Sequence, residues 1–311
     1  MLDMGFEADM DQILGALPRE RQSALFSATF PDAIDALSRA HLRDPARVCI
    51  DEAQQAGPEI EQRVLMTAAA DESKYAALLG VLDRHPCPSA LVFCNLKATV
   101  AELTRALAAE GLSVACLHGD LEQFDRNRVM AMFRNHSVRL LIATDVAARG
   151  LDVEDLELVI NYDLPRQAET YLHRIGRTGR AGKSGLAVSL ASARERGLLD
   201  AIARLTGTPL PRSDAPSPDE GSGERRRQAW AASMDTIQIS GGRKQKVRPG
   251  DILGALTGEA GGLAAADVGK IEIHDHLAHV AVAKTVSRAA VRALDNGRIK
   301  GKRFRATLVR A

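Results

Sequence analysis

Cysteine is scarce in this sequence of 311 residues, and the four that occur, Cys49, Cys87, Cys94 and Cys116, form no Cys-x-x-Cys pair. Metal-ligand spacing and a disulfide framework are therefore missing, and we expect reduced thiols, a cytoplasmic location and no bound metal. No apolar run reaches the roughly 18 residues that would cross a bilayer. The N-terminus also lacks the basic and apolar regions of a signal peptide.

A large net charge is missing too, because 41 basic and 40 acidic side chains leave a formal charge of +1. This balance hides an asymmetry. Residues 234–311 hold 14 Lys and Arg against 7 Asp and Glu, whereas the rest of the chain holds 27 against 33. A basic module on a mildly acidic body is typical of a domain that binds a polyanion. A solvated basic surface without a partner would have the same composition.

The middle of the chain has the pattern of alternating strands and helices. Short apolar runs indicate buried strands at 90–94, 113–117, 138–143, 158–161 and 186–190, and amphipathic patterns indicate helices at 97–110 and 122–134. Buried strands separated by helices predict an α/β domain with a doubly wound parallel sheet, over residues 46–207. Ligand sites are expected at the carboxyl ends of its strands.

Residues 208–233 are predicted to be a linker, because several prolines stand among Ser, Asp and Gly where little apolar surface can be buried. A second unit follows at 234–311. Its predicted strands and helices, in chain order, lie at 236–240, 251–256, 268–273, 279–283, 286–294 and 303–308. The order β-α-β-β-α-β predicts a small α+β domain like an RNA-recognition motif.

The first 45 residues have too few elements for a complete domain. Helices are predicted at 6–17 and 32–41, and a buried strand at 24–26. One strand and two helices cannot form a parallel sheet, so we interpret 1–45 as the remnant of a larger domain. We expect such a remnant to expose apolar surface.

The run His173-Arg174-Ile175-Gly176-Arg177-Thr178-Gly179-Arg180 gives the strongest functional signal. Its arginines are spaced by three, so they would share a face if the segment is helical. Guanidinium groups with so little apolar cover need an anion, and phosphate fits their geometry. An ion-paired surface turn is the alternative. The run resembles motif VI of the DEAD-box helicases, which are ATP-dependent RNA helicases.

This resemblance implies roles for three of these residues. Arg177 and Arg180 would neutralise charge at the γ-phosphate of ATP during hydrolysis, and His173 would couple the nucleotide site to RNA. The fold implied for the middle of the chain is the RecA-like C-terminal domain of a helicase.

Other segments resemble further motifs of the same family in order and spacing. Residues 141–152 resemble motif V, residues 27–29 motif III, residues 92–95 motif IV and residues 118–126 the Gln-x-x-Arg element. The resemblance implies ATP contacts from Gly150 and Asp152, and a relay between hydrolysis and strand separation through Ser27 and Thr29. The RNA contacts that it implies are Asn95, Gly119, Arg126, Thr144 and Arg149.

The basic side chains of the last module cluster after its first predicted strand and before its last one. From these clusters we expect RNA contacts by Arg243, Lys244, Lys246, Lys300, Lys302 and Arg303. On the predicted sheet only His279 could stack on a base, so contacts with the backbone and shape of folded RNA are favoured. Residues 237–309 resemble the C-terminal domain of the DEAD-box protein A branch of the family. That resemblance implies a 23S-type large-subunit rRNA hairpin as partner, within a pre-ribosomal particle.

We therefore expect the C-terminal part of a DEAD-box helicase that acts in large-subunit assembly. ATP and Mg²⁺ would be held mostly by a preceding domain. Because the Walker A lysine and the magnesium-binding carboxylates are missing, the chain alone is expected to be inactive. Two alternatives stay open: a non-catalytic RNA-binding fragment, and a DEAD-box helicase of cold shock or RNA decay.

Overall fold

The computed structural model describes residues 6–26, 32–48, 60–68, 71–148, 153, 156–179, 184–219, 221–259 and 261–310. The chain divides into two compact units, Met1–Gly57 and Pro58–Ala311. No helix in the described part of the chain is both long and apolar enough to cross a membrane.

The first unit holds the helices α1 (Glu7–Ala16) and α2 (Asp32–His41), joined by a hydrogen bond of 2.9 Å between His41 Nε2 and Asp11 Oδ1. The prediction of a buried strand at 24–26 is wrong. These residues have no regular structure, and Phe26 is 94% exposed. A strand is stable only when it is paired, and the described residues of this unit offer no second strand.

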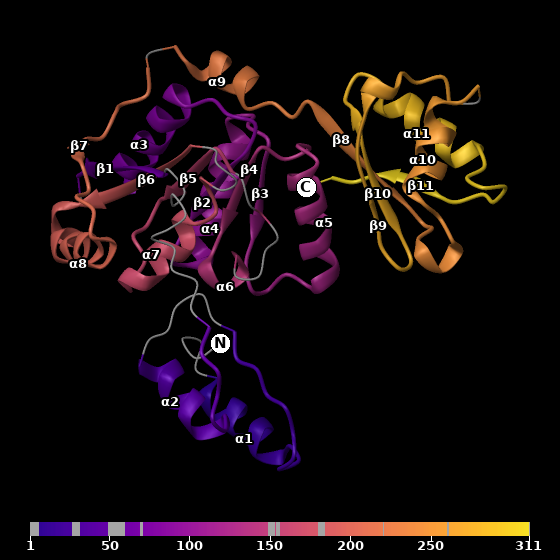
Figure 1. Cartoon of the computed structure of the whole chain (residues 1–311). Helices are drawn as coiled ribbons and strands as arrows, with labels where there is room; N and C mark the ends of the chain where they lie inside the picture. Colours follow the sequence, from indigo (N-terminus) through magenta and orange to yellow (C-terminus); the bar gives the residue numbers. More distant parts are fainter. Residues whose placement is uncertain are drawn as a thin grey trace. The chain divides into compact units, whose positions relative to one another are not determined.

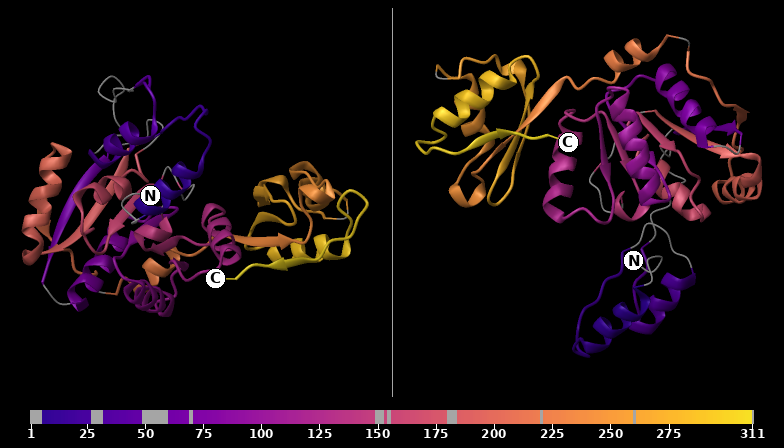
Figure 2. Two further views of the ribbon diagram at one scale, coloured as in Figure 1. Left: turned by 90° about the horizontal axis from the view of Figure 1, so that it is seen from below. Right: turned by 180° about the vertical axis from the view of Figure 1, so that it is seen from behind.

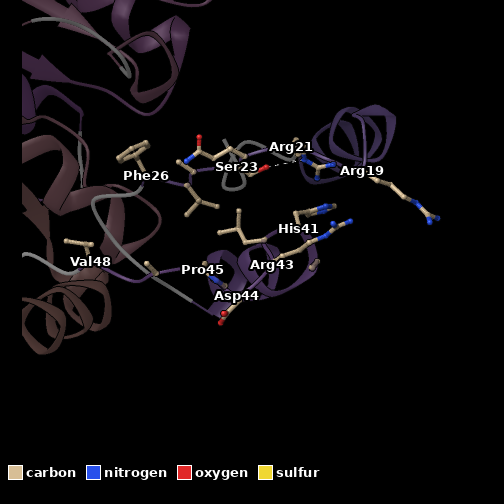
Figure 3. A pocket seen from close by; sticks show the side chains of 15 residues that line it. Arg19, Arg21, Ser23, Phe26, His41, Arg43, Asp44, Pro45 and Val48 are labelled. Atoms are coloured by element: carbon tan, nitrogen blue, oxygen red, sulfur yellow. Dashed lines mark hydrogen bonds between the residues drawn. The ribbon is translucent and has the colours of Figure 1, made fainter.

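A hollow of about 770 Å³ lies in the same unit. In Figure 3 the side chains of Arg21, His41 and Arg43 lie close together at one end of the hollow, and Phe26 lies at the other. Val48, which also lines it, is 86% exposed. The hollow is thus open and partly apolar, and its described polar side chains are chiefly basic.

The second unit contains a seven-stranded sheet in the order β3-β4-β2-β5-β6-β1-β7, with every strand pair parallel (Figure 1). The strands are β1 (Ile60–Thr67), β2 (Ala90–Phe93), β3 (Val114–Leu117), β4 (Leu140–Ala143), β5 (Leu158–Asn161), β6 (Gly185–Ser192) and β7 (Arg212–Asp214). The helices are α3 (Asp71–Arg84), α4 (Lys97–Ala109), α5 (Gln123–Arg134), α6 (Asp145–Ala148), α7 (Ala168–Ile175), α8 (Arg196–Thr206) and α9 (Gly223–Ala229).

Alternating side chains of the central strands supply two cores, one on each face of this sheet. Val92 packs with α3 and α4, whereas its neighbours Leu91 and Phe93 pack with α5 and α6. A third cluster joins β1 and β6 to α7 and α8 through Tyr171 and Leu199. Because both faces are covered, the central strands β2, β4 and β5 are buried at every residue rather than at alternate ones. The predicted doubly wound parallel sheet is confirmed.

The predicted linker, 208–233, contains regular structure that packs on the body. β7 pairs with β1, and α9 lies against α3. Arg226 of α9 donates two hydrogen bonds to the buried Asp83 carboxylate, at 2.7 and 2.8 Å. Trp230 is fully buried and donates its indole N–H to the carbonyl of Leu82 at 3.0 Å. Together with Leu210, which packs in the core beside α8, these large anchors hold the segment on the body.

The remaining strands form a small antiparallel sheet in the order β11-β8-β10-β9, with two helices on one face (Figure 2). Its elements are β8 (Met234–Ile239), α10 (Pro249–Thr257), β9 (Val268–Ile273), β10 (Ala278–Ala283), α11 (Ser287–Asn296) and β11 (Ala306–Leu308). Ile237 and Val280 point into a core with Ile252 of α10 and Leu294 of α11. The predicted β-α-β-β-α-β order is confirmed.

Candidate nucleotide and RNA site

Arg174, near the end of α7, donates five side-chain hydrogen bonds at the carboxyl edge of the parallel sheet. It is 1% exposed. Its Nε and Nη2 donate to the two oxygens of Asp145 at 2.6 and 2.7 Å. The guanidinium carbon also lies 5.0 Å from the centre of the Phe93 ring. This buried cation therefore has an anion and a flat ring on which to pack.

The other N–H groups of Arg174 bond to residues at or just after the ends of neighbouring strands. Nη1 donates to Asn161 Oδ1 at 3.2 Å and to the Asp163 carbonyl at 2.6 Å, and Nη2 donates to Asn95 Oδ1 at 2.8 Å. We call Arg174, Asp145, Asn161, Asp163 and Asn95 the strand-end cluster. All five N–H groups of the guanidinium have an acceptor. The cluster thereby fixes the ends of β4, β2 and β5, which are adjacent in the sheet.

This arrangement differs from the shared helical face that the arginine spacing would give. α7 ends at Ile175, and Gly176 follows it, so Arg177 lies beyond the helix. Arg174 points inward, whereas Arg177 is half-exposed. The anion that Arg174 needs is supplied by the chain itself. Its structural role was missed, although the rule that a buried cation needs a partner could have indicated it.

His173 and Arg177 stand at the surface above the strand-end cluster. His173 is exposed, and both residues line a small hollow together with Asp145 and Thr170. The backbone carbonyl of Arg177 accepts a hydrogen bond from the Leu156 N–H at 3.1 Å. Two basic side chains are thus held at the strand edge where doubly wound sheets bind ligands.

The described residues predicted to contact RNA have different environments. Thr144 directly follows β4 and is 7% exposed, whereas Gly119 is exposed with open space around it. Arg126 of α5 donates to the carbonyl of Ala147 in α6 at 3.0 Å. The Asn95 amide is engaged within the fold, because its Nδ2 donates to the Leu164 carbonyl at 2.8 Å and its Oδ1 accepts from Arg174.

Several predicted site residues fall outside the described part of the chain: Ser27, Thr29, Arg149, Gly150, Asp152 and Arg180. Of the residues predicted for ATP and catalysis, the structure thus describes His173 and Arg177.

Six predicted RNA-contacting residues of the small domain are all exposed: Arg243, Lys244, Lys246, Lys300, Lys302 and Arg303. The two loops that carry them adjoin, because Lys300 Nζ donates to the Lys246 carbonyl at 3.2 Å. Both lysines have positive φ, 61° for Lys246 and 52° for Lys300. A non-glycine residue seldom adopts this conformation without a structural cause, and here each lysine lies in a tight turn. We call the six exposed basic residues of these two loops the basic ridge.

The thiols of the described part are free, and their surroundings disfavour ionisation. Burial raises the pKa of Cys94, and it raises that of Cys87 to about 12. Among the described residues no group of three or more His, Cys, Asp or Glu could hold a metal ion.

Two families match the two domains. Residues 73–182 match the helicase conserved C-terminal domain, and residues 236–308 match the DbpA RNA binding domain. The second match covers the basic ridge and the small antiparallel sheet. The fold and the site thus define the RecA-like C-terminal domain of a helicase, followed by an RNA-binding domain.

Comparison with similar proteins identifies the helicase family more specifically. The chain is 43% identical over its whole length to the ATP-dependent RNA helicase DbpA of Escherichia coli, and 34% identical over 98% of its length to that of Bacillus subtilis. It spans 66% of the length of each. A solved structure of Saccharomyces cerevisiae Dbp5 bound to RNA and ADP BeF3 is 29% identical, with a TM-score of 0.61, covering 73% of this chain and 59% of that one. The chain belongs to the DEAD-box RNA helicases and is DbpA-like.

Proposed function

We propose that this chain supplies the second half of the ATP site and the RNA-targeting domain of an ATP-dependent RNA helicase. The observation that carries the proposal is the strand-end cluster. It fixes α7 so that His173 and Arg177 are presented together at the carboxyl edge of the sheet. The hydrogen bond from the Leu156 N–H fixes the backbone of Arg177 at this edge, and a guanidinium is suited by its charge and geometry to meet a phosphate group from another domain.

ATP with Mg²⁺ fits these residues as a shared ligand, bound mostly by a domain that carries a Walker A lysine. When bound, ATP supplies the free energy of phosphoryl transfer. Arg177, together with Arg180, neutralises negative charge on the γ-phosphate, and His173 transmits the state of this site toward RNA. In a protein that includes an ATP-binding domain, Arg177→Ala should lower the kcat of RNA-stimulated hydrolysis by about 10³-fold.

The chain alone should not hydrolyse ATP. The purified 311 residues, assayed for phosphate release with and without RNA, should give the background rate, because the Walker A lysine and the magnesium-binding carboxylates would come from another domain. RNA-stimulated hydrolysis by this chain would contradict the division of the ATP site between two domains.

The RNA target proposed for the small domain is a hairpin of large-subunit rRNA in a cytoplasmic pre-ribosomal particle. The adjoining loops of the basic ridge support contacts with a folded RNA backbone, since six exposed cations gather there. Similarity to two proteins named as ATP-dependent RNA helicases supports RNA as the ligand. The ridge would hold the hairpin while the helicase body acts on a nearby duplex.

The target can be tested by measuring Kd for this hairpin and for a scrambled RNA at several salt concentrations. The double substitution Lys246→Ala and Lys300→Ala should weaken binding and reduce the salt slope of log Kd by about 1 for each phosphate that is no longer neutralised. Arg288→Ala is the matched control, because Arg288 is an exposed cation at the start of α11. Equal affinity for hairpin and scrambled RNA would refute the proposed rRNA specificity.

A further inference from the structure

Within the second unit, helix α5 contacts the face of the small sheet that α10 and α11 leave uncovered. Arg134 donates to both carboxylate oxygens of Glu272 in β9, each at 2.9 Å. Ser137 and Thr236 share a hydrogen bond of 2.7 Å between their hydroxyl oxygens. The contact is therefore polar.

A slot of about 80 Å³ opens beside these hydrogen bonds. Its lining comes from both domains: Phe124, Asn127 and Arg128 of α5, and Gln238, His274 and His279 of the small domain. About 10–15 Å³ of such space is enough to hold one water molecule, so the slot has room for a larger group. Because it is open on one side, a small planar group could enter it.

Polar atoms without a partner gather in this slot. Among the described residues, six buried side-chain N or O atoms have no hydrogen-bond partner. Four of the six belong to the slot: Arg128 Nε, His274 Nε2 and both ring nitrogens of His279. His279 is only 2% exposed. A buried donor or acceptor that stays unsatisfied costs about 1–3 kcal/mol, so such a concentration indicates a site made for a polar ligand.

The shape and charge of the lining limit what this ligand can be. Phe124 is 52% exposed and offers a flat apolar surface, while the His274 and His279 rings stand edge to face, with centroids 5.4 Å apart. Burial lowers the pKa of His279 to about 4, so its ring is neutral near pH 7, with one nitrogen to donate and one to accept. The charge of Arg128 is already met by Asp125 at 3.4 Å. The lining suits a neutral planar ring better than a phosphate.

We propose that this slot binds one unpaired nucleobase of the RNA, and that a single-ring pyrimidine fits it better than a purine. The base would stack on Phe124 and bond through its edge to His279 and Gln238. The proposal rests on the proposed RNA-binding function and extends it, because the base is bound jointly by the helicase body and the small domain. The basic ridge would hold backbone phosphates, and the slot would add a preference for an unpaired base.

The test compares RNAs that differ only in their bases. Fluorescence anisotropy of the full 311-residue chain gives Kd for a hairpin with a short oligouridine tail, and for the same hairpin with an abasic tail. The uridine tail should bind at least about five-fold more tightly, as expected for one stacked base. Phe124→Ala should remove this difference and leave the abasic Kd unchanged. Leu253→Ala is the control, because Leu253 is an exposed apolar residue of α10, on the opposite face of the sheet.

Several results would overturn the proposal that the slot binds a base. Equal binding of uridine and abasic tails by the unaltered chain, or an equal loss for both in Phe124→Ala, overturns the slot proposal. So does a lack of movement of the His274 and His279 ring signals in NMR spectra when oligouridine is added. An oligoadenosine tail that binds as tightly as oligouridine refutes the pyrimidine preference. Failure of the proposed RNA targeting looks different, since substitutions at Lys246 and Lys300 would then leave both tails unaffected.

Discussion

The strand-end cluster and the slot beside α5 each gather polar side chains around one buried residue, Arg174 in the cluster and His279 in the slot, but their hydrogen bonding is opposite. In the cluster, every N–H of Arg174 has an acceptor within 3.2 Å. In the slot, both ring nitrogens of His279 have none. A satisfied network stabilises one conformation, whereas unsatisfied groups leave hydrogen-bonding capacity for something else. We propose that the first group positions His173 and Arg177 for ATP, and that the second contacts a ligand itself.

The largest effect that tests this contrast is expected at the centre of the cluster. Arg174→Ala leaves Asp145 without its cation and frees the acceptors on three strand ends. Removal of one partner of a buried ion pair costs about 3–5 kcal/mol. For a unit of this size, calorimetry should show a fall in melting temperature of about 10 °C.

Two further variants show whether charge or geometry causes that loss. Arg174→Lys keeps the charge but cannot supply five donors, so a substantial part of the loss should remain. Arg212→Ala breaks only the exposed pair with Asp200 and should change stability by less than about 1 kcal/mol. A stable, soluble Arg174→Ala protein with an unchanged melting temperature would show that the cluster does not support the fold.

A smaller effect is expected from pH, and it comes from the slot. Burial, and then the neighbouring charge of His274, lowers the pKa of His279 to about 4, against an ordinary value near 6.5. Between these values the unfolded chain binds more protons than the folded one. The free energy of unfolding should therefore fall as the pH falls from about 6.5 to about 4, by up to about 3 kcal/mol.

Urea unfolding at a series of pH values measures this dependence. His279→Gln removes the titrating ring and should flatten the curve over that range. Burial also lowers the pKa of His85 and His136, so part of the slope should remain. An unchanged slope in His279→Gln would mean that His279 does not stay neutral in the folded protein.

Regular periodicity in the sequence predicted much of the fold. The strand predicted at 158–161 has the same bounds as β5, and the helix predicted at 97–110 agrees with α4 to within one residue. β7 had no such signal, because its three residues are all exposed and it exists only by pairing with β1. The anchoring of α9 by Arg226 and Trp230 was also missed, because it depends on Asp83 and Leu82, far away in the chain.

The candidate site also contains some residues that the sequence predicted and others that it did not. A local run of residues indicated His173 and Arg177, and the structure places both at one hollow. The partners of Arg174 are spread over three strand ends, so no single run contains them. Phe124 and His279 lie still further apart in sequence, and they meet only because α5 contacts the small sheet. Sequence patterns report periodicity and local motifs, whereas such pairs are created by tertiary packing.

The smallest expected effect on stability is at the edge of the slot. It distinguishes a residue that contacts a ligand from the strand-end cluster, which supports the fold. Phe124 is half-exposed on α5, so Phe124→Ala should change the free energy of unfolding by no more than about 0.5 kcal/mol, as is usual for surface positions. Urea unfolding of this variant and of Arg174→Ala under one set of conditions makes the comparison direct. If Phe124→Ala destabilised the chain by several kcal/mol, Phe124 would belong to the packing between α5 and the sheet. A normal stability together with a lost preference for the uridine tail assigns Phe124 to RNA.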